Sequence, residues 1–267
     1  MTEDALFERQ ANPGIQRRQT AILDLLRQRG FVAIDQMAKA FKVSEQTVRR
    51  DIIQLERRGL VARYHGGAGL PVGRTVMDYD SRKSRFSQEK QIIGGLVASE
   101  VPEGATVFID IGTTMEAVAE ALLGHHQLTI LTNHIAIANL LSQKSEFQII
   151  LAGGLLRQRD HATTGEATRE FLERFRVGYG IFGIGGVEPD GGLLDYDYRD
   201  IGVSKTAMQI SRRKFVALDH SKFGSDATVR VAHACEVDAV FTDMPPPEPY
   251  LSALVDQGVR LVHPGPR

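Results

Sequence analysis

The sequence predicts an α/β protein of two domains, a small N-terminal domain and a larger one built on a parallel-rich sheet. The chain has 267 residues, which exceeds an average single domain. Its charge is divided: residues 15–74 contain twelve basic and five acidic residues, a net +7, so the remainder carries −8. From residue 106 onward, short apolar runs alternate with helical patterns, which is typical of a parallel sheet covered by helices.

The composition favours a cytoplasmic protein. Hydrophobic residues make up 42% of the chain and charged residues 24%, as in ordinary globular proteins. The single cysteine, Cys235, excludes an intramolecular disulfide and a multi-cysteine zinc site. The chain has neither an apolar run long enough to span a bilayer nor a secretion signal at its N-terminus. We therefore expect no membrane contact, and the histidine spacing predicts no metal or cofactor.

Three helices are predicted before residue 60. Their apolar residues recur at helical spacing: Ile22, Leu25 and Leu26 in the first, Met37, Ala38 and Phe41 in the second, and Val48, Ile52 and Leu55 in the third. The first helix covers Arg17 to Arg29, and Asp35 is expected to cap the second. Ser44 is a good N-cap for the third, which is expected to run from Glu45 to Arg58.

The polar face of the third helix is rich in Gln, Thr and Arg, as a DNA-recognition helix requires. An ordinary solvated helix of mixed charge is the alternative, and the basic surroundings make it the weaker one. Glu45 and Asp51 are expected at the edge of the groove or paired with arginine. The candidate DNA contacts are Ser44, Gln46, Thr47, Arg49, Arg50, Arg63 and His65.

A strand pair with a tight turn at Gly66-Gly67 is predicted after the third helix. It would form a wing that brings Arg63 and His65 near the sugar-phosphate backbone. A structural hydrogen bond is an equally good explanation for His65. These elements predict a winged helix-turn-helix DNA-binding domain over residues 15–70, a linker over 71–87 and a second domain over 88–263.

The second domain is expected to bind a small ligand, because such sheets bind ligands beyond the C-terminal ends of their strands. Its strands are predicted at 106–111, 129–132, 148–152, 180–184, 215–219, 239–242 and 259–262. After the first strand, Asp110, Gly112, Thr113 and Thr114 run into a helix and would make an anion cradle, although a plain turn with a threonine cap gives the same pattern. Lys222 would supply a positive point charge for a phosphate.

Two sets of motifs resemble the DeoR family of bacterial repressors. In the first domain they are residues 43–56, Gly59-Leu60 and residues 63–68. In the second they are residues 110–114, Thr132-Asn133, residues 152–154, residues 165–168 and residues 219–224. The resemblance covers residues 17 to 263. It implies an oligomer, a sugar- or polyol-phosphate effector and a sensor fold related to sugar-phosphate isomerases.

Residues 108–114, 195–197 and 242–247 carry a closer resemblance within the family, which implies glycerol 3-phosphate as the favoured effector. His134 departs from the family pattern. The expected effector-binding residues are Asp110, Gly112, Thr113, Thr114, Thr132, Asn133, Gly153, Gly154, Gly185, Asp197 and Lys222.

The resulting hypothesis is a repressor of a carbon-catabolism regulon. As a homodimer or homotetramer, it would bind double-stranded operator DNA and be released by the phosphorylated effector. The alternative is an isomerase-like enzyme with an accessory DNA-binding domain. Such an enzyme needs a proton-transferring group, and its candidates are Asp110, Asp195, Asp197 and Asp219. Each of them is explained as well by a cap, a turn or a ligand hydroxyl acceptor.

Overall fold

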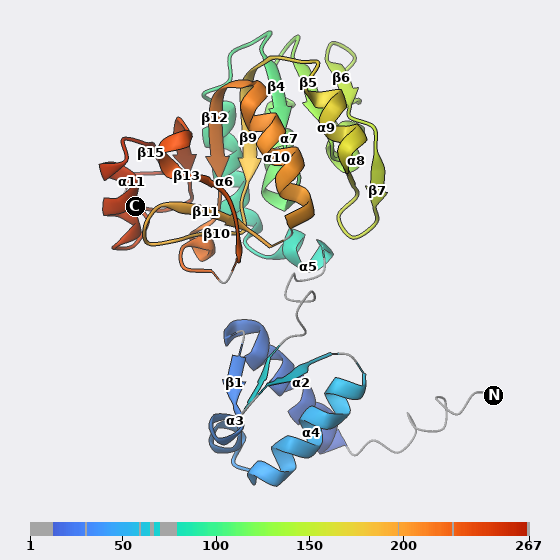
Figure 1. Cartoon of the computed structure of the whole chain (residues 1–267), viewed down its shortest axis with the longest axis vertical. Coiled ribbons are helices and arrows are strands. Elements are labelled where there is room, and N and C mark those ends of the chain that lie inside the picture. The colour runs from blue at the N-terminus through green and yellow to red at the C-terminus, as the bar shows by residue number, and fades with distance from the viewer. Residues whose placement is uncertain are drawn as a thin grey trace, which may run out of the picture. The chain divides into compact units, whose positions relative to one another are not determined.

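The computed structural model describes residues 13–29, 31–58, 60–64, 67–69, 79–196, 198–225 and 227–265. The chain divides into two compact units, Met1–Met77 and Asp78–Arg267. Figure 1 labels most of the elements of both units. Among the described residues, no helix combines the length and apolarity needed to cross a bilayer.

The first unit packs three helices against a small antiparallel sheet. Its elements are α2 (Pro13–Arg29), β1 (Phe31–Ala33), α3 (Ile34–Phe41), α4 (Glu45–Arg57), β2 (Ala62–Tyr64) and β3 (Gly67–Gly69). The strands lie in the order β1-β3-β2. The core contains the residues that the helical spacing predicted, including Ile22, Met37, Val48, Ile52 and Leu55, all fully buried. This arrangement is a winged helix-turn-helix.

Asp35 does not cap the second helix: α3 begins at Ile34 and its N-cap is Ala33, which makes no side-chain cap bond. The helix starts directly after β1, so Asp35 lies in its first turn, where its carboxylate interacts favourably with the helix dipole. Of the two residues predicted to form the turn, Gly66 lies outside the described residues, as does His65, whereas Gly67 belongs to β3 and not to a turn.

The second unit contains a seven-stranded sheet in which every neighbouring pair is parallel. Its strands are β4 (Thr106–Ile109), β5 (Thr129–Thr132), β6 (Gln148–Leu151), β9 (Val177–Gly183), β12 (Ser211–Ala217), β14 (Ala239–Phe241) and β15 (Arg260–Val262). They lie in the order β15-β14-β12-β9-β4-β5-β6. The chain therefore runs outward from β4 in one direction and then outward from β9 in the other, which is the doubly wound topology.

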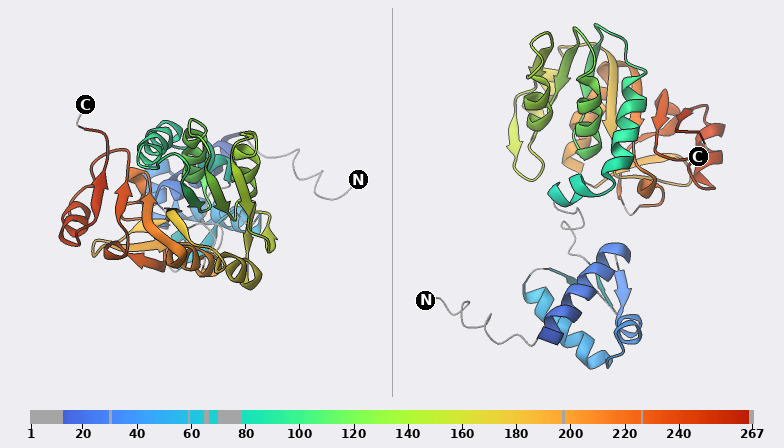
Figure 2. Two further views of the ribbon diagram at one scale, coloured as in Figure 1. Left: turned by 90° about the horizontal axis from the view of Figure 1, so that it is seen from above. Right: turned by 180° about the vertical axis from the view of Figure 1, so that it is seen from behind.

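Helices cover both faces of this sheet (Figures 1 and 2). The helices of the unit are α5 (Tyr79–Ser84), α6 (Ser87–Ala98), α7 (Thr113–Leu122), α8 (Ile135–Leu141), α9 (Glu166–Leu172), α10 (Tyr198–Ile210) and α11 (Tyr250–Asp256). Successive side chains of β4 enter two different cores. Phe108 packs with the residues of α9 and α10, whereas Val107 and Ile109 pack with those of α6, α7 and α8.

Smaller elements complete the second unit. An antiparallel sheet contains β10 (Gly186–Val187), β11 (Gly192–Asp195) and β13 (Val229–His233), and a hairpin contains β7 (Leu155–Arg157) and β8 (Ala162–Thr164). The short helix η2 (His220–Lys222) follows β12. Part of the predicted linker is helical: residues 79–84 form α5, because Tyr79 is buried and anchors them to the second unit. Residues 70–78 lie outside the described residues.

Candidate DNA-binding and effector sites

The first half of α4 presents polar side chains to solvent. Ser44 caps the helix as predicted: its hydroxyl accepts the Thr47 N–H at 3.2 Å and lies 2.9 Å from the Thr47 hydroxyl. Gln46, Arg49 and Arg50 are exposed. Four of the predicted DNA contacts therefore lie on or beside the first turn of α4, and Arg50 follows directly. The four are Ser44, Gln46, Thr47 and Arg49.

Glu45 and Asp51 both pair with arginine, as the sequence predicted. Glu45 lies one turn before Arg49, and the two exposed side chains are 3.0 Å apart. Asp51 is buried and its Oδ2 lies 2.5 Å from Nε of Arg18, a contact that raises the pKa of that arginine. Because Arg18 belongs to α2, this buried pair holds the recognition helix against the rest of the unit.

The described part of the wing consists of the antiparallel strands β2 and β3. Arg63 is exposed on β2, and its Nε lies 2.7 Å from Oε2 of Glu56 near the end of α4. An exposed pair of this kind contributes little stability and leaves the guanidinium accessible to a phosphate. His65, the other predicted wing contact, lies outside the described residues.

In the second unit the reversal of strand order falls between β4 and β9. At such a reversal the following helices turn to opposite faces of the sheet and leave a crevice beyond the strand ends. Asp110 follows β4 and is buried, and its Oδ2 accepts the hydroxyl of Ser204 in α10 at 3.0 Å. The predicted cradle therefore begins at the reversal point.

Gly112 has the geometry that a cradle requires. Its φ is +121°, in the left-handed region that favours glycine, and a Cβ built on it would meet no atom within 4 Å. It precedes α7, whose first residues are Thr113 and Thr114, so backbone N–H groups begin at an open position. Nothing in the described surroundings fills the space beside Gly112.

Gly154 and Gly185 differ from Gly112, because each is packed against its own neighbours, whereas a Cβ on Gly153 would meet no atom within 4 Å. A Cβ on Gly154 would lie 2.0 Å from Oγ1 of Thr168, and one on Gly185 would lie 2.8 Å from the ring of Tyr196. Close packing explains both. Gly153 is exposed, and its carbonyl accepts the Thr168 hydroxyl at 2.9 Å.

Thr132 and Asn133 follow β5 and are buried. The Thr132 hydroxyl donates to the Ile109 carbonyl at 2.8 Å and accepts the His134 N–H at 3.1 Å, so it joins two strand ends. The Asn133 amide nitrogen donates to the Thr163 carbonyl at 3.0 Å. Its Oδ1 is buried and accepts no hydrogen bond from the described residues, which leaves one acceptor for a ligand hydroxyl.

Charged side chains from several elements gather beyond the strand ends. Lys222, in η2, is half-buried, and burial lowers its pKa although Asp219 and Asp195 oppose the effect. Burial in turn raises the pKa of Asp195 against the field of Lys222, Arg157 and Arg82. Asp197 lies outside the described residues.

Sequence reasoning missed two cations of this cluster, Arg82 and Lys90. Lys90 is buried, its Nζ donates to the carbonyls of Arg82 and Arg85, and burial lowers its pKa to about 8. A signal for Lys90 exists in the sequence: it lies three residues before Ile93 and seven before Val97, on the buried face of α6. Arg82 has no such signal, because six residues are too few to show a period.

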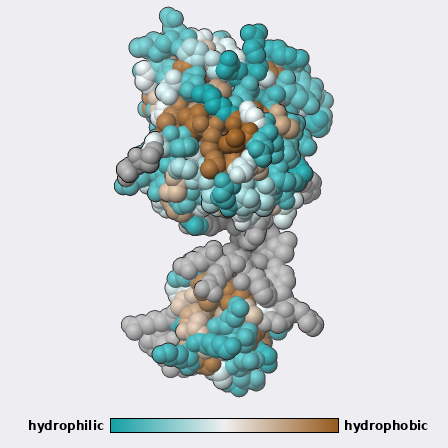
Figure 3. Space-filling view, turned by 90° about the vertical axis from the view of Figure 1, so that its left-hand side faces the viewer, coloured by the Kyte–Doolittle hydropathy of each residue, from teal (hydrophilic) through white to brown (hydrophobic). Residues whose placement is uncertain are grey.

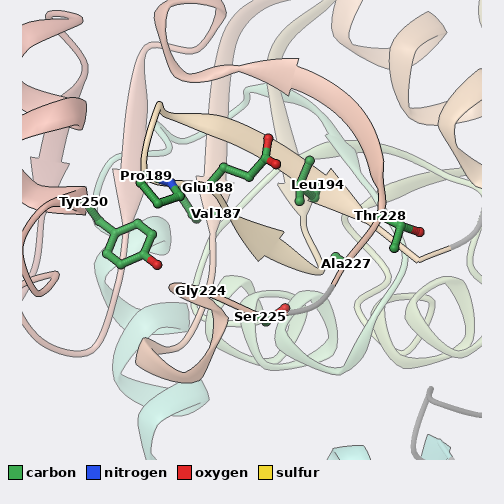
Figure 4. A pocket seen from close by; sticks show the side chains of 9 residues that line it. All are labelled: Val187, Glu188, Pro189, Leu194, Gly224, Ser225, Ala227, Thr228 and Tyr250. Carbon is green, nitrogen blue, oxygen red and sulfur yellow. The ribbon is translucent and has the colours of Figure 1, made fainter. Parts of the chain in front are cut away.

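A surface pocket lies beside the small antiparallel sheet (Figure 4). It is lined by Val187, Glu188, Pro189, Leu194, Gly224, Ser225, Ala227, Thr228 and Tyr250. These described lining residues include a carboxylate and no cation, so the pocket is poorly suited to a phosphate. Among the residues that the structure describes, no three or more His, Cys, Asp or Glu side chains are placed to hold a metal ion.

A winged helix-turn-helix joined to a doubly wound α/β domain defines a two-domain transcriptional regulator. Residues 18–72 match the DeoR-like helix-turn-helix domain, and residues 85–244 match the DeoR C terminal sensor domain. The chain belongs to the DeoR family.

Several relatives are similar over nearly the full chain. The glycerol-3-phosphate regulon repressor of Escherichia coli K12 is 44% identical over 92% of this chain and 97% of its own length. That of Haemophilus influenzae is 43% identical over 92% and 95%. The HTH-type transcriptional repressor CsqR of E. coli is 36% identical over 97% and 98%. The protein is therefore a transcriptional repressor with a sensor domain and not an enzyme.

Among solved structures, ribose 5 phosphate isomerase A from Neisseria gonorrhoeae is similar with a TM-score of 0.38 and 16% identity. The similarity covers 51% of this chain and 53% of that one. A similarity of this size carries no information about function.

Proposed function

We propose that this repressor binds operator DNA through α4 and the wing, and is released by a phosphorylated sugar or polyol. Glycerol 3-phosphate is the favoured effector. The observation that carries the proposal is the open backbone at Gly112, which lies at the reversal of strand order in a sensor unit with cations at its strand ends. N–H groups and a lysine are the usual partners of a phosphate, and a carboxylate or amide oxygen suits a hydroxyl.

The relatives support the choice of effector. Two proteins that are 43–44% identical to this chain are named repressors of the glycerol-3-phosphate regulon. Other relatives in the same family have different names, such as the lactose phosphotransferase system repressor of Staphylococcus epidermidis, which is 31% identical. Family membership therefore supports a phosphorylated metabolite in general, and the higher identity favours glycerol 3-phosphate.

The proposal includes a homodimer or homotetramer. Helix-turn-helix repressors reach tight binding by placing two recognition helices on two half-sites. Apolar surface is gathered in one area of the larger unit (Figure 3). Such surface is typical of self-association.

A gel-shift titration tests the proposal. The full chain is bound to the DNA upstream of its own gene, and glycerol 3-phosphate, fructose 6-phosphate or unphosphorylated glycerol is added. We expect release by glycerol 3-phosphate at lower concentrations than by the sugar phosphate, and no release by glycerol. Release by fructose 6-phosphate alone would refute the favoured effector but not the phosphorylated class, whereas release by neither would refute both.

A further inference from the structure

Residues 79–90, here called the covering segment, lie against the ends of several strands. At the end of β5, the Tyr79 ring stacks on His134 with centroids 5.9 Å apart, and its hydroxyl lies 3.1 Å from His134 Nε2. After β12, the Phe86 ring meets the His220 ring edge-on at 4.8 Å. The segment thus extends from one side of the strand reversal to the other.

Between these two contacts the covering segment touches the first turn of α7. Nζ of Lys83 lies 2.7 Å from Oε2 of Glu116, and Oε1 of the same carboxylate accepts the Tyr79 hydroxyl. The Thr113 hydroxyl lies 3.5 Å from the carbonyl of Arg82. Arg82 therefore sits next to the start of the helix that follows the open Gly112.

The side chain of Arg82 is directed into the charged cluster. One of its terminal nitrogens is buried, and its guanidinium lies 5.3 Å from the centre of the Tyr79 ring. Its charge acts on Lys90, Lys222 and Asp195, so these groups lie within electrostatic range of one another. Three cations in such proximity repel one another, and a bound dianion would relieve that repulsion.

We propose that Arg82 is an effector-binding residue that contacts the phosphate group together with Lys222, while Lys90 positions Arg82 by bonding the backbone carbonyls of the covering segment. This inference rests on the proposed function, since it concerns the same site. An arginine fork adds two parallel donors to the point charge of a lysine, which suits the oxygens of a phosphate.

An effector bound by Arg82 would directly contact the covering segment, which follows the DNA-binding unit along the chain. α5 is the first described element after β3 along the chain. A ligand held by Arg82 would fix that segment, whereas a ligand held only by residues of the sheet would not. Differential contact of this kind is what allows a ligand to shift a conformational equilibrium.

The test compares Arg82→Gln with the matched control Arg85→Gln in the full chain. Both remove one charge from the same segment, but Arg85 is exposed and lies over the Phe86 ring at 4.7 Å. Calorimetry measures the binding of glycerol 3-phosphate and, separately, of inorganic phosphate. We expect Arg82→Gln to weaken both by roughly tenfold to a hundredfold and Arg85→Gln to weaken both only slightly.

Two further measurements separate ligand contact from a structural role. Arg82→Gln should keep the melting temperature of the unliganded protein and its operator affinity, while more effector is needed for release. If Arg82→Gln does not fold, Arg82→Lys replaces it and should bind more weakly than the parent because the fork is lost.

The outcomes distinguish the two proposals. If the parent binds both probes and the Arg82 variant binds them equally well, the role of Arg82 is refuted and the proposed function stands. If the Arg82 and Arg85 variants lose equal affinity for the probes, the role of Arg82 is also refuted, since equal losses indicate that either charge acts only through the long-range electrostatic field. A parent that binds neither probe refutes the effector site itself.

Discussion

The two units place positive charge in opposite ways. In the DNA-binding unit the buried carboxylate Asp51 is paired with Arg18 inside the fold, and Arg49 and Arg50 lie on the surface. In the sensor unit Lys90 is buried, and Arg82 and Lys222 are half-buried with charges that act on one another. A large polyanion is met on an outer surface, whereas a small anion must be enclosed. The buried and half-buried cations of the sensor unit thus favour a small anionic ligand.

The largest effect is expected from Arg50→Ala. If the outward arginines serve the DNA, losing one from each recognition helix of a dimer should cost operator binding about 2–6 kcal/mol. Gel shifts at fixed salt measure the change, and calorimetry should show unchanged effector binding. Arg174→Ala, which removes an exposed arginine of the sensor unit, is the control. If the two variants lose equal operator affinity, the exposed arginines of the first unit have no special role in DNA binding.

Asp51→Ala tests the internal pairing of the first unit. It leaves Arg18 without its carboxylate, and we expect a loss of about 3 kcal/mol in the free energy of unfolding of that unit, since 22% of the Arg18 side chain keeps contact with water. Urea unfolding followed by circular dichroism measures it. Glu45→Ala, which breaks the exposed pair with Arg49, should change stability by less than about 0.5 kcal/mol. Similar values for both would mean that burial of Asp51 has no energetic consequence.

Lys222→Ala tests the enclosed cations. We expect the variant to hold operator DNA normally but to bind glycerol 3-phosphate about 1.5–3 kcal/mol more weakly, because a charged hydrogen bond to the phosphate is lost. Lys205→Ala, which removes an exposed lysine of α10, is the control. An unchanged effector response in Lys222→Ala would show that the phosphate binds elsewhere.

The smallest effect is a pH dependence of effector binding. Lys90 has a pKa of about 8 because it is buried and faces Lys222, Arg82 and Arg85, with Asp219 in opposition. A bound anionic effector stabilises the protonated form of Lys90 and so raises that pKa. The affinity for the effector should therefore fall as the pH rises through about 8. The loss by pH 9 should be no more than roughly tenfold.

The effector phosphate is already dianionic above pH 7, so its own titration does not contribute. Calorimetry at pH 7, 8 and 9 measures the change. Lys90→Gln keeps a donor for the carbonyls and should bind with little pH dependence. If the affinity of the parent protein for the effector does not depend on pH, the charge of Lys90 does not act on the effector.

The pH dependence of stability has the opposite sign. Between about pH 8 and the ordinary lysine pKa of 10.5, Lys90 is neutral in the folded protein and protonated in the unfolded chain. The unfolded state then binds more protons, so the contribution of Lys90 to the free energy of unfolding rises with pH across this window.

The sequence predicted the first unit well because its signals are local. The spacing of Val48, Ile52 and Leu55 and the cap at Ser44 each act within a few residues. All seven strands of the parallel sheet were also predicted, since each of them contains a short run of mainly apolar residues. The small sheet of β10, β11 and β13 was missed, because strands of two to five residues show little alternation.

The candidate site was harder to predict, since the same residue type has different roles. Gly112, Gly154 and Gly185 each follow a strand of the main sheet, yet only Gly112 faces open space. What distinguishes them is the position of Thr168 and Tyr196, which tertiary packing decides. Arg82 was assigned to the linker for the same reason: its neighbours in space lie far from it in the chain.

The hydrogen bond between Asp110 and Ser204 predicts how ligand binding could be detected in solution. Asp110 follows β4 and precedes α7, which packs on one face of the sheet, and Ser204 belongs to α10 on the other. A ligand seated beside Gly112 would brace both layers at the point where they meet. Amide hydrogen exchange should then slow in α7 and α10 together, with matching dependence on ligand concentration.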